Sequence, residues 1–140
     1  MECCIRFLTR EEFNQLLKEA PETETRNLLR ITREFNVDPY DFLIDISLEK
    51  EGILINDRPI YLGILSKDKE LWTVVNSNVK EQFTLFKVAK RGLKKLVDKY
   101  EIIYATMEKV NSKNMLWTER LGFKKYKENN CFITYILQGS

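Results

Sequence analysis

The sequence contains no histidine, and this absence removes several kinds of chemistry. Serine–histidine and cysteine–histidine nucleophile pairs are impossible, as are histidine-ligated metal sites. Any general acid or base must therefore be Glu, Asp, Tyr, Lys, Cys, a chain terminus or water. The three cysteines, Cys3, Cys4 and Cys131, are odd in number and lack the spacing of metal ligands. We interpret them as buried or idle thiols in a reducing, cytoplasmic-type compartment, and we expect no metal site.

Glycine and proline are also scarce, with 5 and 3 residues in a chain of 140. This composition excludes collagen and low-complexity disorder. No apolar run approaches the roughly 18 residues of a membrane span. The N-terminus does not combine a basic region with an apolar stretch, so we expect neither a signal peptide nor a membrane partner. The length favours a single domain over residues 1–140.

Charge is distributed unevenly along the chain. Residues 1–60 carry 8 basic and 13 acidic side chains (net −5), whereas residues 61–140 carry 15 and 8 (net +7). The basic excess is densest at Lys80, Lys87, Lys90, Arg91, Lys94, Lys95 and Lys99. A helix face of this kind attracts polyanions, so an acidic protein or DNA is a predicted partner of the face from Lys87 to Lys99. The alternative is an ordinary solvated helix face.

Helix signals dominate the N-terminal part. A short apolar run at residues 5–8 predicts an edge strand. Thr9 and Glu12 then have the spacing of a capping box, which predicts a helix that begins at Thr9 and ends before Pro21. A second helix is predicted over residues 22–35.

The next segment, residues 39–50, carries two conflicting patterns. Asp38 and Pro39 are a typical helix start, and Gly52 suits the end of a helix. Apolar residues at every second position over 42–48 instead fit a strand. We favour a helix over residues 39–50, because both of its ends carry the expected residues.

Strands and helices alternate in the rest of the sequence. Residues 56–59 are of the types that favour a turn, and the polar stretch 67–70 predicts a second turn. The predicted strands are 53–55, 60–65, 71–75, 101–107, 123–127 and 131–137, and the predicted helices are 81–99 and 111–121. This order belongs to the α/β or α+β class, and its strand–helix–strand passage predicts a crossover between neighbouring strands.

Residues 111–123 resemble a motif of the GNAT superfamily of N-acyltransferases. The segment begins with Asn111 and ends in Glu-Arg-Leu-Gly-Phe at 119–123, with the spacing that this family shows. The order of elements is similar to the family over most of the chain. The resemblance implies one GNAT-like domain with a mixed, mostly antiparallel sheet. In that sheet a central parallel strand pair, here 71–75 and 102–107, splays apart between flanking helices.

The same resemblance implies a function. A GNAT-like acyltransferase moves an acetyl group from acetyl-CoA to a primary amine of a small molecule or protein. The pantetheine arm lies between the splayed strands, and the pyrophosphate lies at the start of the long helix, where backbone N–H groups favour an anion. The implied cofactor-binding residues are Val74, Val75, Asn76, Ser77, Asn78, Val79, Lys80 and Asn111. The family usually has a glycine-rich turn at this point, whereas residues 76–82 contain no glycine.

The resemblance also points to candidate catalytic residues. Thr118 lies where many members carry the tyrosine that protonates the leaving thiolate, and Tyr104 and Tyr126 are the other candidates for this acid. A general base for the amine has to be a carboxylate or a water chain. The carboxylates near predicted strands are Glu70, Glu108 and Asp57.

Three further segments, 36–39, 56–64 and 70–74, resemble GNAT-like proteins encoded by tailed bacteriophages, some of which are internal virion proteins. This narrower resemblance implies an alternative function. The chain would be a non-catalytic protein of GNAT fold that serves as an internal virion or host-interaction module, in the virion or the host cytoplasm. The glycine-free stretch 76–82, Thr118 and the absence of histidine favour this alternative.

Overall fold

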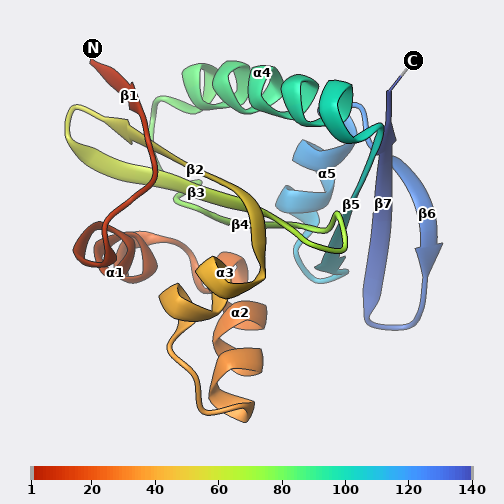
Figure 1. Ribbon diagram of the computed structural model, residues 1–140, viewed down its shortest axis with the longest axis horizontal. Helices are drawn as coiled ribbons and strands as arrows, with labels where there is room; N and C mark the ends of the chain where they lie inside the picture. Colours follow the sequence, from red (N-terminus) through yellow and green to blue (C-terminus); the bar gives the residue numbers. More distant parts are fainter. Residues whose placement is uncertain (1, 140) are drawn as a thin grey trace. The chain divides into compact units, whose positions relative to one another are not determined.

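The computed structural model describes residues 2–139, which form two compact units. The first unit holds the residues up to Lys67 together with Trp72–Lys80, and the second holds Asp68–Leu71 and the residues from Glu81 onward. One sheet has the strand order β1-β2-β3-β4, and the other has the order β5-β7-β6 (Figure 1). The predicted mixed α/β fold with mostly antiparallel pairing is therefore confirmed.

The first two helices form where capping residues and apolar spacing predict them. Helix α1 (Arg10–Glu19) follows Thr9, whose hydroxyl accepts a hydrogen bond from the N–H of Glu12 at 3.2 Å. The Glu12 carboxylate accepts one from the N–H of Thr9 at 2.9 Å, which completes the predicted capping box. Helix α2 (Glu22–Glu34) begins directly after Pro21.

The conflicting segment contains a helix and a strand in succession. Helix α3 (Pro39–Ile46) starts at Asp38, whose carboxylate accepts from the N–H of Asp41 at 3.0 Å. Strand β2 (Ser47–Ile55) begins at the next residue. The predicted helix over 39–50 is therefore wrong beyond residue 46. The backbone from residue 47 onward pairs with a neighbouring strand instead of continuing the helix.

Strand β1 (Cys3–Ile5) pairs with the end of β2, so the predicted edge strand at 5–8 lies too late in the sequence. Leu8 packs in the hydrophobic core instead. All three cysteines are exposed free thiols. Of the two alternatives, buried or idle thiols, burial is therefore wrong, because Cys3 and Cys4 lie on a short edge strand and Cys131 lies in a hairpin connection. The idle alternative stays a prediction.

Strands β2 and β3 (Arg58–Ser66) form a tight hairpin. Its two connecting residues, Asn56 and Asp57, have positive φ angles of 51° and 65°. A two-residue hairpin turn of this type needs positive φ at both positions, which Asn and Asp tolerate. The predicted turn at 56–59 is thus two residues shorter, since Arg58 and Pro59 already pair within the sheet.

The core of the first unit lies where α1, α2 and α3 meet the sheet, whose last strand is β4 (Leu71–Val75). Its members are buried apolar side chains from all of these elements. They are Leu8, Phe13, Leu16, Leu28, Leu43, Leu54, Leu62, Ile64 and Val74. Burial of such side chains stabilises the unit by about 1.5–3 kcal/mol each, before conformational entropy is subtracted.

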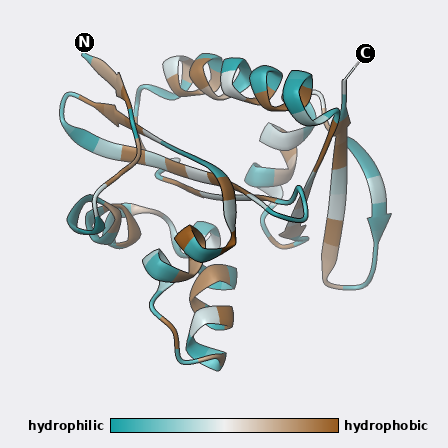
Figure 2. Cartoon of the chain, viewed as in Figure 1, coloured by the Kyte–Doolittle hydropathy of each residue, from teal (hydrophilic) through white to brown (hydrophobic). Residues whose placement is uncertain are grey.

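The second unit contains α4 (Gln82–Tyr100), β5 (Ile102–Glu108), α5 (Ser112–Arg120), β6 (Lys124–Glu128) and β7 (Phe132–Gln138). Every second residue of β5 is buried, which leaves one face of this strand in the core and the other half-exposed. Apolar residues recur along α4 with polar residues between them, as expected for a helix with one buried face (Figure 2). Among the described residues, no helix is both long and apolar enough to cross a membrane.

The capping box of α1 gives the first prediction. A hydrogen bond from the Arg6 guanidinium lowers the pKa of Glu12 to about 2. We expect Glu12→Gln to lower the free energy of unfolding by about 1 kcal/mol at pH 7, since both an ion pair and a cap are weakened. The difference from the wild type should shrink as the pH falls from about 4.5 toward 2, because the carboxylate then becomes protonated in both states.

Urea denaturation at several pH values measures this difference. Glu11→Gln is the matched control, because Glu11 lies in the same helical turn and is exposed. A difference between wild type and Glu12→Gln that stays constant over this pH range would contradict the assigned role of the ion pair.

Candidate functional site

Among residues 2–139, one strand bridge lies outside the regular strand pairings, and it is parallel. Glu70, which directly precedes β4, pairs with Tyr104 of β5. The N–H of Tyr104 donates to the carbonyl oxygen of Lys69 at 2.8 Å. All three residues belong to the second unit. This parallel contact lies one residue before the predicted strand 71–75. The predicted strands themselves belong to different sheets, β4 to the four-stranded one and β5 to the three-stranded one.

Glu70 is half-buried rather than an exposed turn residue. Burial raises the pKa of its carboxyl group, the nearby Asp68 carboxylate raises it further, and Lys127 partly opposes both effects. A carboxylate with a raised pKa is a better proton acceptor than an ordinary one, because its pKa lies nearer to the working pH. Of the described features of Glu70, its burial and its raised pKa are the ones that a general base needs.

The other two predicted bases lie in less suitable places. Asp57 is an exposed residue of the β2–β3 hairpin turn. Glu108 is the last residue of β5 and pairs with Phe132 of β7. Of the three carboxylates that the sequence suggested, Glu70 is the one at the parallel bridge.

Two of the predicted acid candidates lie together. The rings of Tyr104 and Tyr126 contact each other with centroids 5.6 Å apart and planes inclined by 55°. Tyr104 is half-buried, whereas Tyr126 is exposed. The tyrosine pair, defined by these two residues, therefore lies directly beside the backbone bridge that Glu70 makes.

Thr118, the third candidate, has a structural role. Its side chain is buried, and its hydroxyl donates to the carbonyl oxygen of Asn114 one turn earlier, at 2.7 Å. Asn111 caps the same helix, since its side-chain oxygen accepts from the N–H of Asn114 at 3.1 Å. Both residues therefore stabilise helix α5.

The predicted cofactor segment, residues 74–80, runs from the end of β4 into the loop that follows. Val74 belongs to the core of the first unit, so its side chain is not available to a ligand. In the loop, Asn76, Ser77 and Val79 are buried, whereas Asn78 and Lys80 are exposed. No residue of this loop has a positive φ angle. It therefore lacks the left-handed residue found in many backbone anion nests.

Asn76 is the unusual residue of this loop. Its side-chain oxygen accepts a hydrogen bond from the N–H of Asn78 at 3.2 Å. This bond fixes the orientation of the amide group and leaves the nitrogen Nδ2 buried, with no hydrogen-bond partner among the described residues. An unsatisfied buried donor costs about 1–3 kcal/mol, so such groups call for an explanation.

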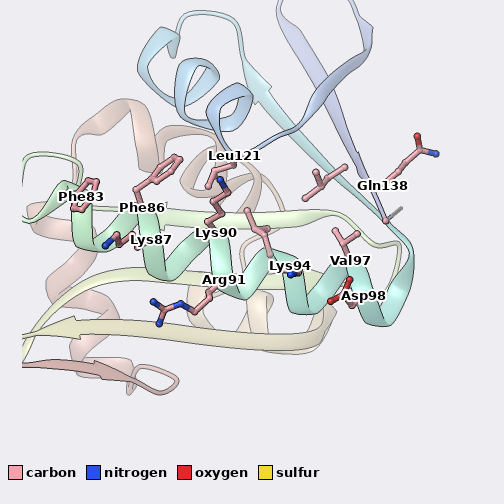
Figure 3. Close-up of a pocket in the computed structure, with 13 residues that line it drawn as sticks. Phe83, Phe86, Lys87, Lys90, Arg91, Lys94, Val97, Asp98, Leu121 and Gln138 are labelled. Atoms are coloured by element: carbon pink, nitrogen blue, oxygen red, sulfur yellow. The ribbon is translucent and has the colours of Figure 1, made fainter.

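Part of the predicted basic face of α4 borders a groove. Four of its cations, Lys87, Lys90, Arg91 and Lys94, line a groove of about 680 Å³ together with apolar residues (Figure 3). Lys95 and Lys99 do not line it. In the part of the chain that the structure describes, no group of three acidic or cysteine side chains could hold a metal ion.

Sequence reasoning missed one interaction within the 111–123 motif. The hydroxyl of Tyr135, a fully buried residue of β7, donates to the carboxylate of Glu119 on α5 at 2.6 Å. Burial and this carboxylate both raise the pKa of Tyr135. The Glu of the motif therefore ties α5 to the sheet. No local signal in the sequence pairs these two residues, because they are 16 positions apart.

Comparison with known proteins identifies the fold. No family model matches the sequence, and no curated protein matches it. A probable acetyltransferase from Staphylococcus epidermidis is 15% identical, with a TM-score of 0.72 over 99% of this chain and 100% of that one. PaiA N-acetyltransferase from Thermoplasma acidophilum, solved with coenzyme A, is 14% identical, with a TM-score of 0.68 over 99% and 100% of the chains.

A third structure is the Campylobacter jejuni N-acetyltransferase PseH in complex with acetyl coenzyme A. It is 17% identical, with a TM-score of 0.57 over 99% of this chain and 100% of that one. The chain therefore has the fold of the GNAT-family acetyltransferases along its whole described length. This agrees with the fold that the 111–123 motif implied.

The Tyr135–Glu119 bond gives a prediction about stability. We expect Tyr135→Phe to lower the free energy of unfolding by about 1 kcal/mol, because the Glu119 carboxylate loses its hydroxyl donor. Urea denaturation measures the change. Tyr126→Phe is the matched control, since the Tyr126 side chain is exposed, and it should change the stability by less than about 0.5 kcal/mol. Equal effects of the two substitutions would contradict a structural role for the bond.

Proposed function

We propose that this chain is an N-acetyltransferase that transfers the acetyl group of acetyl-CoA to a primary amine on a small molecule or protein. The observation that carries the proposal is Glu70, a half-buried carboxyl with a raised pKa at the parallel bridge to Tyr104. The fold supports it, since N-acetyltransferases with coenzyme A or acetyl coenzyme A bound share this fold. In this proposal, residues 1–140 form one GNAT-like domain.

Residues 74–80 would hold the cofactor. The buried donor Nδ2 of Asn76 has no acceptor within the described protein, and an oxygen of the cofactor would supply one. Lys80, an exposed cation in the same loop, would contribute charge toward the phosphate groups. Val74 and Val75 would contribute backbone groups. The Val74 side chain packs in the core of the first unit, so it would not contact the cofactor. Acetyl-CoA would supply the acetyl group as a reactive thioester.

The proton transfers are assigned to Glu70 and the tyrosine pair. Glu70 takes a proton from the ammonium group of the acceptor, which frees the nitrogen lone pair to form the new C–N bond. As the C–S bond breaks, a hydroxyl of the tyrosine pair would give its proton to the leaving sulfur. The second proton of the attacking nitrogen would return to that tyrosinate, and Glu70 would release its proton to water. The Thr118 hydroxyl is committed to the carbonyl oxygen of Asn114, so the proposal does not use it. Asn111 is likewise assigned to capping α5.

The geometry of the loop favours a second candidate function. Residues 76–80 have neither a glycine nor a positive φ angle, and Val79 is buried among them. A protein of GNAT fold that no longer catalyses transfer, such as the internal virion or host-interaction module implied by the phage resemblance, would need no phosphate nest. A cytoplasmic or virion location stays a prediction. Repeated release of the free thiol of coenzyme A with any amine acceptor rules this candidate out.

The first test concerns Asn76. We expect acetyl-CoA to bind the wild-type protein in a calorimetric titration and Asn76→Ser to weaken binding about five- to tenfold, the value of roughly one hydrogen bond. Serine keeps an acceptor for the N–H of Asn78 but removes the amide donor. Asn14→Ser is the matched control, because Asn14 is exposed and lies outside residues 74–80. No heat of binding at millimolar acetyl-CoA would refute the proposed function.

The second test concerns Glu70. We expect Glu70→Gln to lower kcat by about 100-fold, the usual contribution of a general base, with little change in the affinity for acetyl-CoA. In the wild type, kcat should rise with pH as Glu70 loses its proton, and the variant should lose this limb of the profile. Glu108→Gln is the control on β5. Full activity of Glu70→Gln would remove Glu70 from the reaction.

A substitution of Asp68 provides a second test of how kcat rises with pH. The Asp68 carboxylate raises the pKa of Glu70, so Asp68→Asn should move the acidic limb of the kcat profile to lower pH. The plateau at high pH should stay unchanged, because Glu70 is ionised there in both proteins. A limb that does not move would assign the titration to a different group.

A further inference from the structure

An open groove runs along α4 on the second unit (Figure 3). It extends from Phe83 in the first turn of the helix to Asp98 near its end, a length of about 22 Å at 1.5 Å per residue. The end of α5 contributes Leu121, and the end of β7 contributes Leu137. The volume of about 680 Å³ lies within the range of ligand-binding sites.

The floor and one end of the groove are apolar. Leu93 and Val97 of α4 form its base. Phe86 stands against Trp117 of α5 in an edge-to-face contact, with ring centroids 5.6 Å apart, which holds the Phe86 ring in place. Phe83 is 73% exposed, an unusual position for a large aromatic side chain. An apolar groove with an exposed aromatic residue at its mouth is typical of a surface that binds a partner.

The rim of the groove is cationic. Lys87, Lys90, Arg91 and Lys94 follow one another at helical spacing, and Asp98 is the one acidic residue among the lining side chains. These four cations form a stripe that spans about 10 Å along the helix axis. The Lys87 ammonium lies 4.7 Å from the centre of the Phe83 ring, so charge and apolar surface are adjacent at this end.

We propose that this groove binds an acidic amphipathic helix of a partner protein. Such a helix places leucine-like side chains at spacings of three and four on the apolar floor and its carboxylates opposite the stripe. The complementary charge of the stripe speeds encounter and fixes the orientation of the partner. This docking function is separate from acetyl transfer and holds whether or not the chain is catalytic.

The distribution of charge selects this occupant over other anions. A fatty acid or similar amphiphile carries one anionic group at one end, so it would engage one cation and leave the rest of the stripe without a counterion. Double-stranded DNA presents a row of phosphates, but it has no apolar side chains for Phe83, Leu93 or Leu121. A row of carboxylates beside a row of apolar side chains matches both halves of the groove.

Fluorescence anisotropy with a designed peptide tests the proposal. The probe is a fluorescein-labelled helix of about 16 residues, or ~24 Å, with leucine along one face and glutamate on both flanks. We expect it to bind the full chain and to weaken at least tenfold with Lys90→Glu/Lys94→Glu. Lys95→Glu/Lys99→Glu is the matched control, because it makes the same change in net charge on α4 outside the groove. The control should stay within about twofold of the wild type, since Lys95 and Lys99 do not line the groove and salt screens exposed charges.

Several outcomes would overturn the proposal. One is equal weakening by the two double variants, which would mean attraction to the overall charge of the protein. Another is equal binding of a scrambled peptide whose leucines do not share a face. Tighter binding of a DNA duplex or of phosphatidylglycerol vesicles through the same residues would assign the groove to a different partner. Displacement of the peptide by acetyl-CoA would assign it to the cofactor. Circular dichroism checks that each variant is folded.

Discussion

One backbone hydrogen bond, from the N–H of Tyr104 to the carbonyl oxygen of Lys69, organises the candidate catalytic region. It fixes the residue after Lys69, Glu70, as the parallel partner of Tyr104. Lys69 itself has a φ angle of 66°, so the chain turns sharply at this point. A carboxyl group is thereby held half-buried, with the Asp68 carboxylate nearby. Its raised pKa follows from that burial and from the Asp68 carboxylate two residues earlier in the chain.

The 111–123 motif shows how a family signature can have structural causes. Asn111 caps α5, Thr118 bonds back to the preceding turn, and Glu119 accepts the hydroxyl of Tyr135. Gly122, the glycine of the motif, has a φ angle of 102°, which residues with a side chain rarely adopt. The motif therefore specifies how the short helix begins, ends and attaches to the sheet. It identifies a fold more directly than it identifies a catalyst.

The cationic face of α4 illustrates why composition alone leaves function open. From the sequence, the lysines of this helix fit a solvated surface as well as a polyanion site. The structure divides them into two groups, because Lys90 and Lys94 border an apolar groove whereas Lys95 and Lys99 do not. The groove requires Leu121 and Leu137, which come from two other elements. Spacing along one helix cannot place them there.

The sequence by itself determined the features that depend on near neighbours in the chain. These are the capping box at Thr9, the helix start at Asp38, the order of strands and helices, and the motif that identified the fold. Tertiary structure decided the rest. Helix α3 ends at residue 46 because the backbone from Ser47 onward pairs with β3. The sequence around residue 46 does not reveal this pairing, because β3 is distant in the chain. Burial likewise singled out Glu70 among three carboxylates and left the Asn76 amide without an acceptor, since burial depends on every element that packs around a residue.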